Sequence, residues 1–149
     1  MNIDRMKEIR EYFDNTQEEI SKVLGTTRST YANWESLDIP IPLDKLNLFC
    51  NYYGISLDYI CGLTNTKKSN IINDKIDLKN IGNKLREIRT SHNDTQSKIA
   101  NIIQVDQSNY SKWELGKIII KIYPLIEFAK HYNVSIDYIC GKVNNSDIK

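Results

Sequence analysis

An internal repeat constrains the fold of this chain more than any other feature of its sequence. Thr16 aligns with Thr95, and the same ungapped offset of 79 aligns residues 5–62 with residues 84–141. The segments SLDYICG and SIDYICG close the two copies. A solenoid needs more and shorter repeats, so two long copies indicate a duplicated domain. We therefore predict one domain over residues 1–65, a linker over residues 66–79 and a second domain over residues 80–149.

The spacing of apolar residues predicts five short helices in each copy. The first helix is expected over residues 3–13, with Met6, Ile9 and Phe13 on one face. Apolar residues at helical spacing also mark the fourth helix of each copy: Leu43, Leu46, Phe49, Cys50 and Tyr53, matched by Leu125, Phe128, Ala129 and Tyr132. Ser56 and Ser135 are suited to N-cap the last helix. The expected fold class is all-α.

Each copy also carries a pair of helices joined by a tight turn, over residues 17–35 and 96–114. In the second copy Thr95 and Asp106 are suited to cap the two helices, and Tyr110 and Trp113 face the core at a spacing of three. The opposite face carries amide, hydroxyl and ammonium groups from Gln107, Ser108, Ser111 and Lys112. A short helix with such side chains near its N-terminus suits the DNA major groove, where base edges display donors and acceptors.

Composition excludes several other classes of protein. The 149 residues are 40% apolar and 26% charged, which is ordinary for a soluble globular protein. No apolar run approaches the roughly 18 residues of a membrane span, so we expect a cytoplasmic protein without membrane contact. The three cysteines form no CxxC pair and are expected to be buried thiols. Because no nucleophile pattern, metal cluster or phosphate loop is visible, we expect no enzyme activity, metal, cofactor or small-molecule ligand.

The formal net charge of +1 conceals an uneven distribution along the chain. Residues 1–66 hold six lysines and arginines against ten aspartates and glutamates, a net charge of −4. Residues 81–149 hold ten against seven, a net charge of +3. Since a nucleic-acid partner requires cations, the second copy is the better candidate for DNA contact.

Several motifs together resemble a known family. Both copies contain TQ, an apolar-spaced helix, a turn and then S-x-Y-x-x-W-E, and the first copy adds PLDKL and YYGISLDYICG. This combination resembles the lambda-repressor-like helix-turn-helix family, of the Cro and XRE type, over nearly the whole chain outside the linker. The resemblance implies two tandem five-helix domains, each with a recognition helix in third position.

The resemblance also implies which residues act in each copy. The positions that would contact DNA are Gln17, Arg28, Ser29, Thr30 and Asn33 in the first copy, and Gln96, Gln107, Ser108, Asn109 and Lys112 in the second. Their chemistry agrees, because glutamine and asparagine can bond adenine bidentately, arginine can bond guanine and lysine suits a phosphate. The resemblance further implies structural ion pairs between Arg10 and Glu35 and between Arg89 and Glu114.

Each copy departs from the family pattern at one turn. The family usually has glycine between helices two and three, where a positive φ is wanted. The first copy has Gly25 there, but the second has Gln104, which costs about 1 kcal/mol if the turn is retained. Conversely, Gly116 follows helix three in the second copy, where the first copy has Leu37. The sequence leaves open whether the turn of the second copy differs.

The expected function is sequence-specific binding of double-stranded DNA by a transcriptional regulator, with repression as the favoured role. The two domains would read two half-sites as a homodimer or as an intramolecular pseudo-dimer. An extended linker of about fourteen residues reaches roughly 46 Å, which is long enough for the two domains to bind DNA one helical turn apart. Small domains also gain stability by packing together, so the sequence leaves both arrangements open. The alternative function is a protein-interaction module in which one degenerate, acidic copy modulates another DNA-bound factor.

Overall fold

The computed structural model describes residues 3–68 and 70–148, so positions 1, 2 and 149 and Ser69 of the expected linker lie outside the described residues. Every regular element in this described part of the chain is an α-helix, which confirms the all-α fold class. Unit one contains α1 (Ile3–Tyr12), α2 (Gln17–Val23), α3 (Arg28–Glu35), α4 (Leu43–Tyr53) and α5 (Leu57–Ile60). Unit two contains α6 (Leu78–Ser91), α7 (Gln96–Ile102), α8 (Gln107–Glu114), α9 (Ile122–Tyr132) and α10 (Ile136–Ile139).

Hydroxyl side chains begin several of these helices, as the sequence predicts. Oγ1 of Thr95 accepts the backbone amide of Lys98 at 3.0 Å, which caps α7. Ser56 and Ser135 cap α5 and α10 in the same way, at 2.9 and 3.1 Å. Because the first amides of a helix have no partner within it, these bonds fix where each helix starts.

The apolar faces of both units belong to one continuous core. All nine residues predicted for the buried faces of α4 and α9 are buried, and so are the three cysteines, which are free thiols. Met6 and Ile9 are buried as expected, but Phe13 is 49% exposed. The prediction for Phe13 is wrong because α1 ends at Tyr12, one residue before it. Its ring lies on Tyr53 at the edge of the core, with ring centroids 5.1 Å apart.

The segment between the units is fastened to both of them. The carbonyl of Asp74 accepts hydrogen bonds from Nδ2 of Asn47 and of Asn51 on α4, each at 2.9 Å. The amide of Ile72 donates to the carbonyl of Lys142, which follows α10, at 2.8 Å. Helix α6 begins at Leu78, within the residues assigned to the linker. Of the two arrangements that the sequence leaves open, the structure has the one in which the units pack together.

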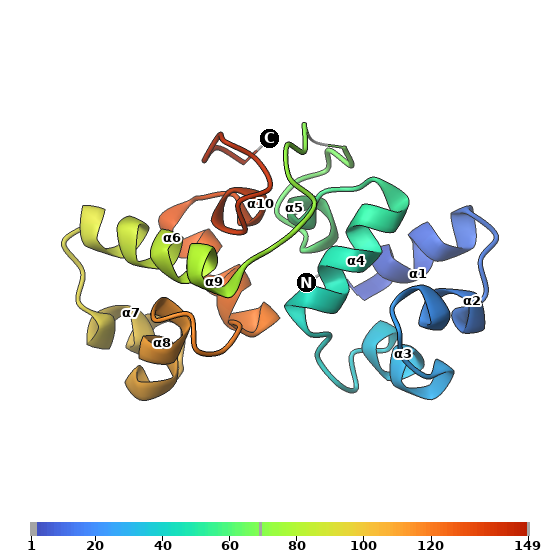
Figure 1. Cartoon of the computed structure of the whole chain (residues 1–149), viewed down its shortest axis with the longest axis horizontal. Coiled ribbons are helices and arrows are strands. Elements are labelled where there is room, and N and C mark those ends of the chain that lie inside the picture. The colour runs from blue at the N-terminus through green and yellow to red at the C-terminus, as the bar shows by residue number, and fades with distance from the viewer. Residues whose placement is uncertain (1–2, 69, 149) are drawn as a thin grey trace.

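Figure 1 shows unit one on the right and unit two on the left, with α5 and α10 between them at the centre. These two short helices are in contact. The third helices of the units, α3 and α8, lie at the same edge of the molecule, away from α5 and α10 (Figure 1). Among the described residues, no helix has the length and apolar character needed to span a membrane.

Candidate nucleic-acid interface

The turn between the second and third helices has the same geometry in both units. Gly25 has φ +69° and Gln104 has φ +59°, so both adopt the left-handed conformation. After Gly25, the amide of Thr26 donates to the carbonyl of Ser21 at 2.9 Å, and the equivalent bond after Gln104 also measures 2.9 Å. Unit two thus retains the turn despite the missing glycine. The turn leads into α8 in the same way as the turn of unit one leads into α3.

The N-termini of the two third helices are built differently. Oγ1 of Thr27 accepts the amide of Thr30 at 3.2 Å and also donates to the hydroxyl of Thr30 at 3.0 Å. Asp106 occupies the equivalent position before α8, but its side chain makes no capping hydrogen bond. The prediction that Asp106 caps α8 through its carboxylate is therefore wrong. Asp106 is exposed, so its carboxylate has no burial that would require the helix amides as partners.

The polar side chains predicted to contact DNA lie on the outer faces of α3 and α8. Arg28 and Ser29 are exposed, whereas Thr30 and Asn33 are half-buried. In unit two all four equivalent side chains are exposed: Gln107, Ser108, Asn109 and Lys112. Within the described part of the chain, these four side chains make no hydrogen bond or ion pair. Unit two therefore presents a larger set of donors and acceptors that are available to a ligand.

A buried ion pair braces each third helix from behind. Nε and Nη2 of Arg89 donate to the two carboxylate oxygens of Glu114 at 2.7 and 2.9 Å. Arg10 binds Glu35 in the same bidentate manner, at 2.9 and 2.7 Å. Burial alone would raise the pKa of Glu114, but the hydrogen bonds and charge of Arg89, together with neighbouring polar side chains such as Gln96, outweigh burial and hold the pKa below its usual value. The pKa of Glu35 is lowered in the same way, so both carboxylates are ionised at neutral pH, and the ends of α3 and α8 are tied to α1 and α6.

The glutamines that open the second helices turn toward these ion pairs. Nε2 of Gln17 lies 3.4 Å from Oε1 of Glu35, and Nε2 of Gln96 lies 3.2 Å from Oε1 of Glu114. Both glutamine side chains are half-buried. Their amides thus join the start of the second helix to the end of the third, a role that was not predicted from the sequence. Contact with DNA by these residues stays a prediction.

Basic side chains continue beyond α8 along the loop that follows it. Lys117 and Lys121 are exposed there, next to the exposed Lys112 on α8 itself. The equivalent positions of unit one carry no cation: they are Asn33, Asp38 and Pro42. Lys117 and Lys121 are not among the residues predicted from the sequence. The repeat alignment nevertheless holds the signal, since it sets each lysine against an uncharged or acidic residue.

Comparison with known proteins agrees with this geometry. A helix-turn-helix family model matches residues 6–60 and again residues 85–139, which together make up more than half of the chain. YobD of Bacillus subtilis (strain 168), an uncharacterized HTH-type transcriptional regulator, is 34% identical over 64 residues, spanning 43% of this chain and 57% of that relative. No solved structure matches the chain significantly. The family is not an enzyme family. The chain thus belongs to the lambda-repressor-like helix-turn-helix family and carries two copies of its domain in tandem.

Proposed function

We propose that this chain is a sequence-specific, double-stranded DNA-binding transcriptional regulator that acts in the cytoplasm and places α3, α8 or both in the major groove. The observation that carries the proposal is the set of contacts that the third helix makes on its inner face, together with the polar side chains on its outer face. In each unit it is braced from behind by a buried ion pair and points unpartnered polar side chains outward. Repression is the favoured role, because a protein that occupies a duplex excludes others from it.

The dimensions of the third helices support this placement. An α-helix with its side chains is about 10–12 Å across, and the major groove of B-DNA is about 12 Å wide. Arg28 at the start of α3 suits guanine, whereas Gln107 and Asn109 at the start of α8 suit adenine. Residues near the N-terminus of a recognition helix are those that reach base edges.

Charge favours unit two as the stronger DNA-binding unit. Lys112, Lys117 and Lys121 are exposed around the end of α8 and can neutralise phosphates. In unit one, Glu18 and Asp38 are exposed near the corresponding surface. We therefore propose that unit two supplies most of the affinity.

Selection from a random duplex pool tests the proposal. The full chain should enrich a defined sequence, and its affinity should fall steeply between 50 and 200 mM salt, by roughly 40-fold to 150-fold if three or four phosphates are neutralised. The double variant Gln107→Ala, Asn109→Ala should lose preference at the bases it reads. The matched control is Asn80→Ala, Asn83→Ala, which removes two exposed amides from α6 instead. Unchanged specificity in the first variant would refute base reading by α8.

The acidic character of unit one supports one other candidate function. With a net charge of −4 over residues 1–66, unit one suits a basic protein partner better than a phosphate backbone. A protein-interaction module that modulates another DNA-bound factor would enrich no duplex by itself, even at low salt. That result would replace our proposal with this alternative.

A further inference from the structure

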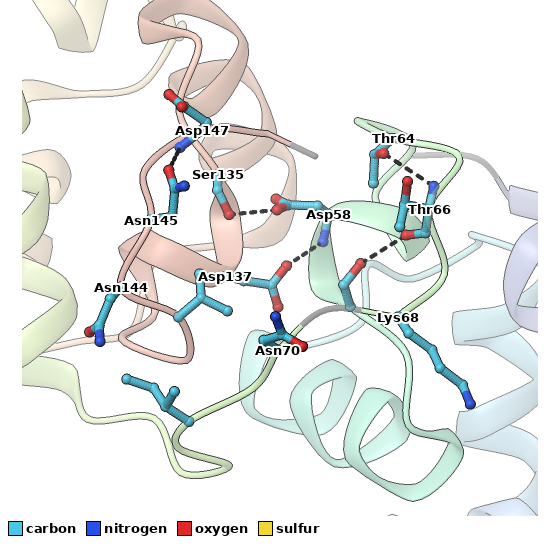
Figure 2. Close-up of a pocket in the computed structure, with 13 residues that line it drawn as sticks. Asp58, Thr64, Thr66, Lys68, Asn70, Ser135, Asp137, Asn144, Asn145 and Asp147 are labelled. Carbon is cyan, nitrogen blue, oxygen red and sulfur yellow. Dashed lines mark hydrogen bonds between the residues drawn. The ribbon is translucent and has the colours of Figure 1, made fainter.

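The contact between the two units is made by equivalent residues that exchange hydrogen bonds. The carboxylate of Asp58 on α5 accepts from the amide of Ile136 at 2.6 Å and from Oγ of Ser135. The carboxylate of Asp137 on α10 accepts from the amides of Leu57 and Asp58 at 3.0 and 2.9 Å. Figure 2 shows Asp58 and Asp137 facing each other across this contact. Each carboxylate thus caps the helix of the other unit.

The offset of 79 that relates the two repeats also relates these hydrogen bonds. Asp58 is equivalent to Asp137, and Leu57 is equivalent to Ile136. The bond from Ile136 to Asp58 is therefore equivalent to the bond from Leu57 to Asp137. In a contact of this kind, residue i touches j and the equivalent of j touches the equivalent of i, which is the signature of a two-fold axis. The chain is therefore an intramolecular pseudo-dimer, with its axis between α5 and α10.

Buried groups fix the two units in this orientation. Asp58 and Asp137 are 6% and 1% exposed, and Lys142, which follows α10, is fully buried. Nζ of Lys142 donates to Oδ1 of Asn51 on α4 at 2.9 Å. The linker is also bonded to unit one through Asp74 and to unit two through Ile72, so the units form one body and are not two independent domains on a flexible linker.

A two-fold relation sets how α3 and α8 meet a duplex. Both helices lie at one edge of the molecule (Figure 1), and the two-fold relation between the units relates one helix to the other. A protein dyad of this kind matches half-sites in inverted orientation, at a spacing that its own geometry dictates.

The two third helices nevertheless carry different side chains at equivalent positions. Arg28 in α3 corresponds to Gln107 in α8, and Asn33 corresponds to Lys112. Arginine favours guanine and glutamine favours adenine, so we expect the two units to prefer different bases at this position. We infer that one chain, without a second copy, binds an asymmetric operator made of two unlike half-sites in inverted orientation at one fixed spacing. The inference rests on the proposed function, and it adds the form of the DNA site and the stoichiometry.

The duplex selected by the full chain provides the test. We expect one chain per duplex by native mass spectrometry, and at least a tenfold loss of affinity when five base pairs, about half a helical turn, are inserted between the half-sites. The same five base pairs placed outside the site are the control. Arg28→Ala should relax preference in one half-site only, and Gln107→Ala in the other only.

The outcomes separate the inference from the function on which it rests. Two chains on a symmetric palindrome, half-sites in direct repeat, or affinity insensitive to the insertion would each overturn the inference while leaving sequence-specific binding intact. Failure to enrich any duplex would overturn the proposed function, and the inference with it.

Discussion

Replacing Gln104 by glycine should make the protein more stable. Gln104 has φ +59° and its exposed side chain makes no hydrogen bond within the described residues. A residue with a Cβ costs about 1–2 kcal/mol in the left-handed conformation. Glycine avoids this strain but has a more flexible unfolded state, which costs about 0.5–1 kcal/mol. The expected net gain for Gln104→Gly is therefore about 0.5–1 kcal/mol in the free energy of unfolding.

Urea denaturation followed by circular dichroism measures this gain, and for a chain of this size it corresponds to about 1–4 °C in Tm. Gly25→Ala is the matched change in unit one. A Cβ on Gly25 would have Nζ of Lys45, at 3.7 Å, as its nearest neighbour, so no clash contributes. This variant should lose about 1 kcal/mol from backbone strain alone. If Gln104→Gly were destabilising while Gly25→Ala had no effect, the backbone argument would be refuted.

Three further substitutions test the packing of the units. Gly82→Ala should destabilise unit two by several kcal/mol in denaturation and weaken DNA binding, because the new Cβ would lie 2.4 Å from the carbonyl oxygen of Glu114 at the end of α8. Glu114→Gln should cost about 3 kcal/mol by leaving the largely buried guanidinium of Arg89 without its counter-charge, and an equally stable variant would show that the ion pair is not a brace. Asp58→Asn should remove a pH dependence of the free energy of unfolding. Burial and the charge of Asp137 raise the pKa of Asp58 to about 7, so the folded state binds more protons than the unfolded state between about pH 4 and pH 7. Wild-type stability should therefore fall as the pH rises from 5 to 8 relative to Asp58→Asn, and parallel unfolding profiles would contradict this.

The repeat and the apolar spacing predicted most of the fold because burial follows local periodicity. The fourth helices and the serine caps appear in the structure where the sequence places them. Phe13 is an exception, since it lies one residue beyond the end of α1, and periodicity does not say where a helix stops. Asp106 is another, because a residue suited to capping can direct its side chain to water instead.

The contact between the units could not be predicted in the same way. Asp58 and Asp137 each stand second in a four-residue helix, where an acidic residue ordinarily complements the amides of its own helix. Only the assembled structure shows that each caps the opposite helix. The signal in the sequence was a carboxylate in the middle of an apolar segment, present in both copies. The bonds from Gln17 and Gln96 to the buried glutamates depend likewise on side-chain directions that spacing does not encode.

The covalent link between the two units bears on how the protein would respond to its own abundance. A regulator assembled from separate subunits must associate before it binds, so its occupancy of DNA changes steeply with concentration. Here the second unit is always present at the high effective concentration that a short, fastened linker provides. Occupancy of a single site should follow a simple hyperbola in protein concentration, with a Hill coefficient of about 1, and should persist when few copies of the chain are present.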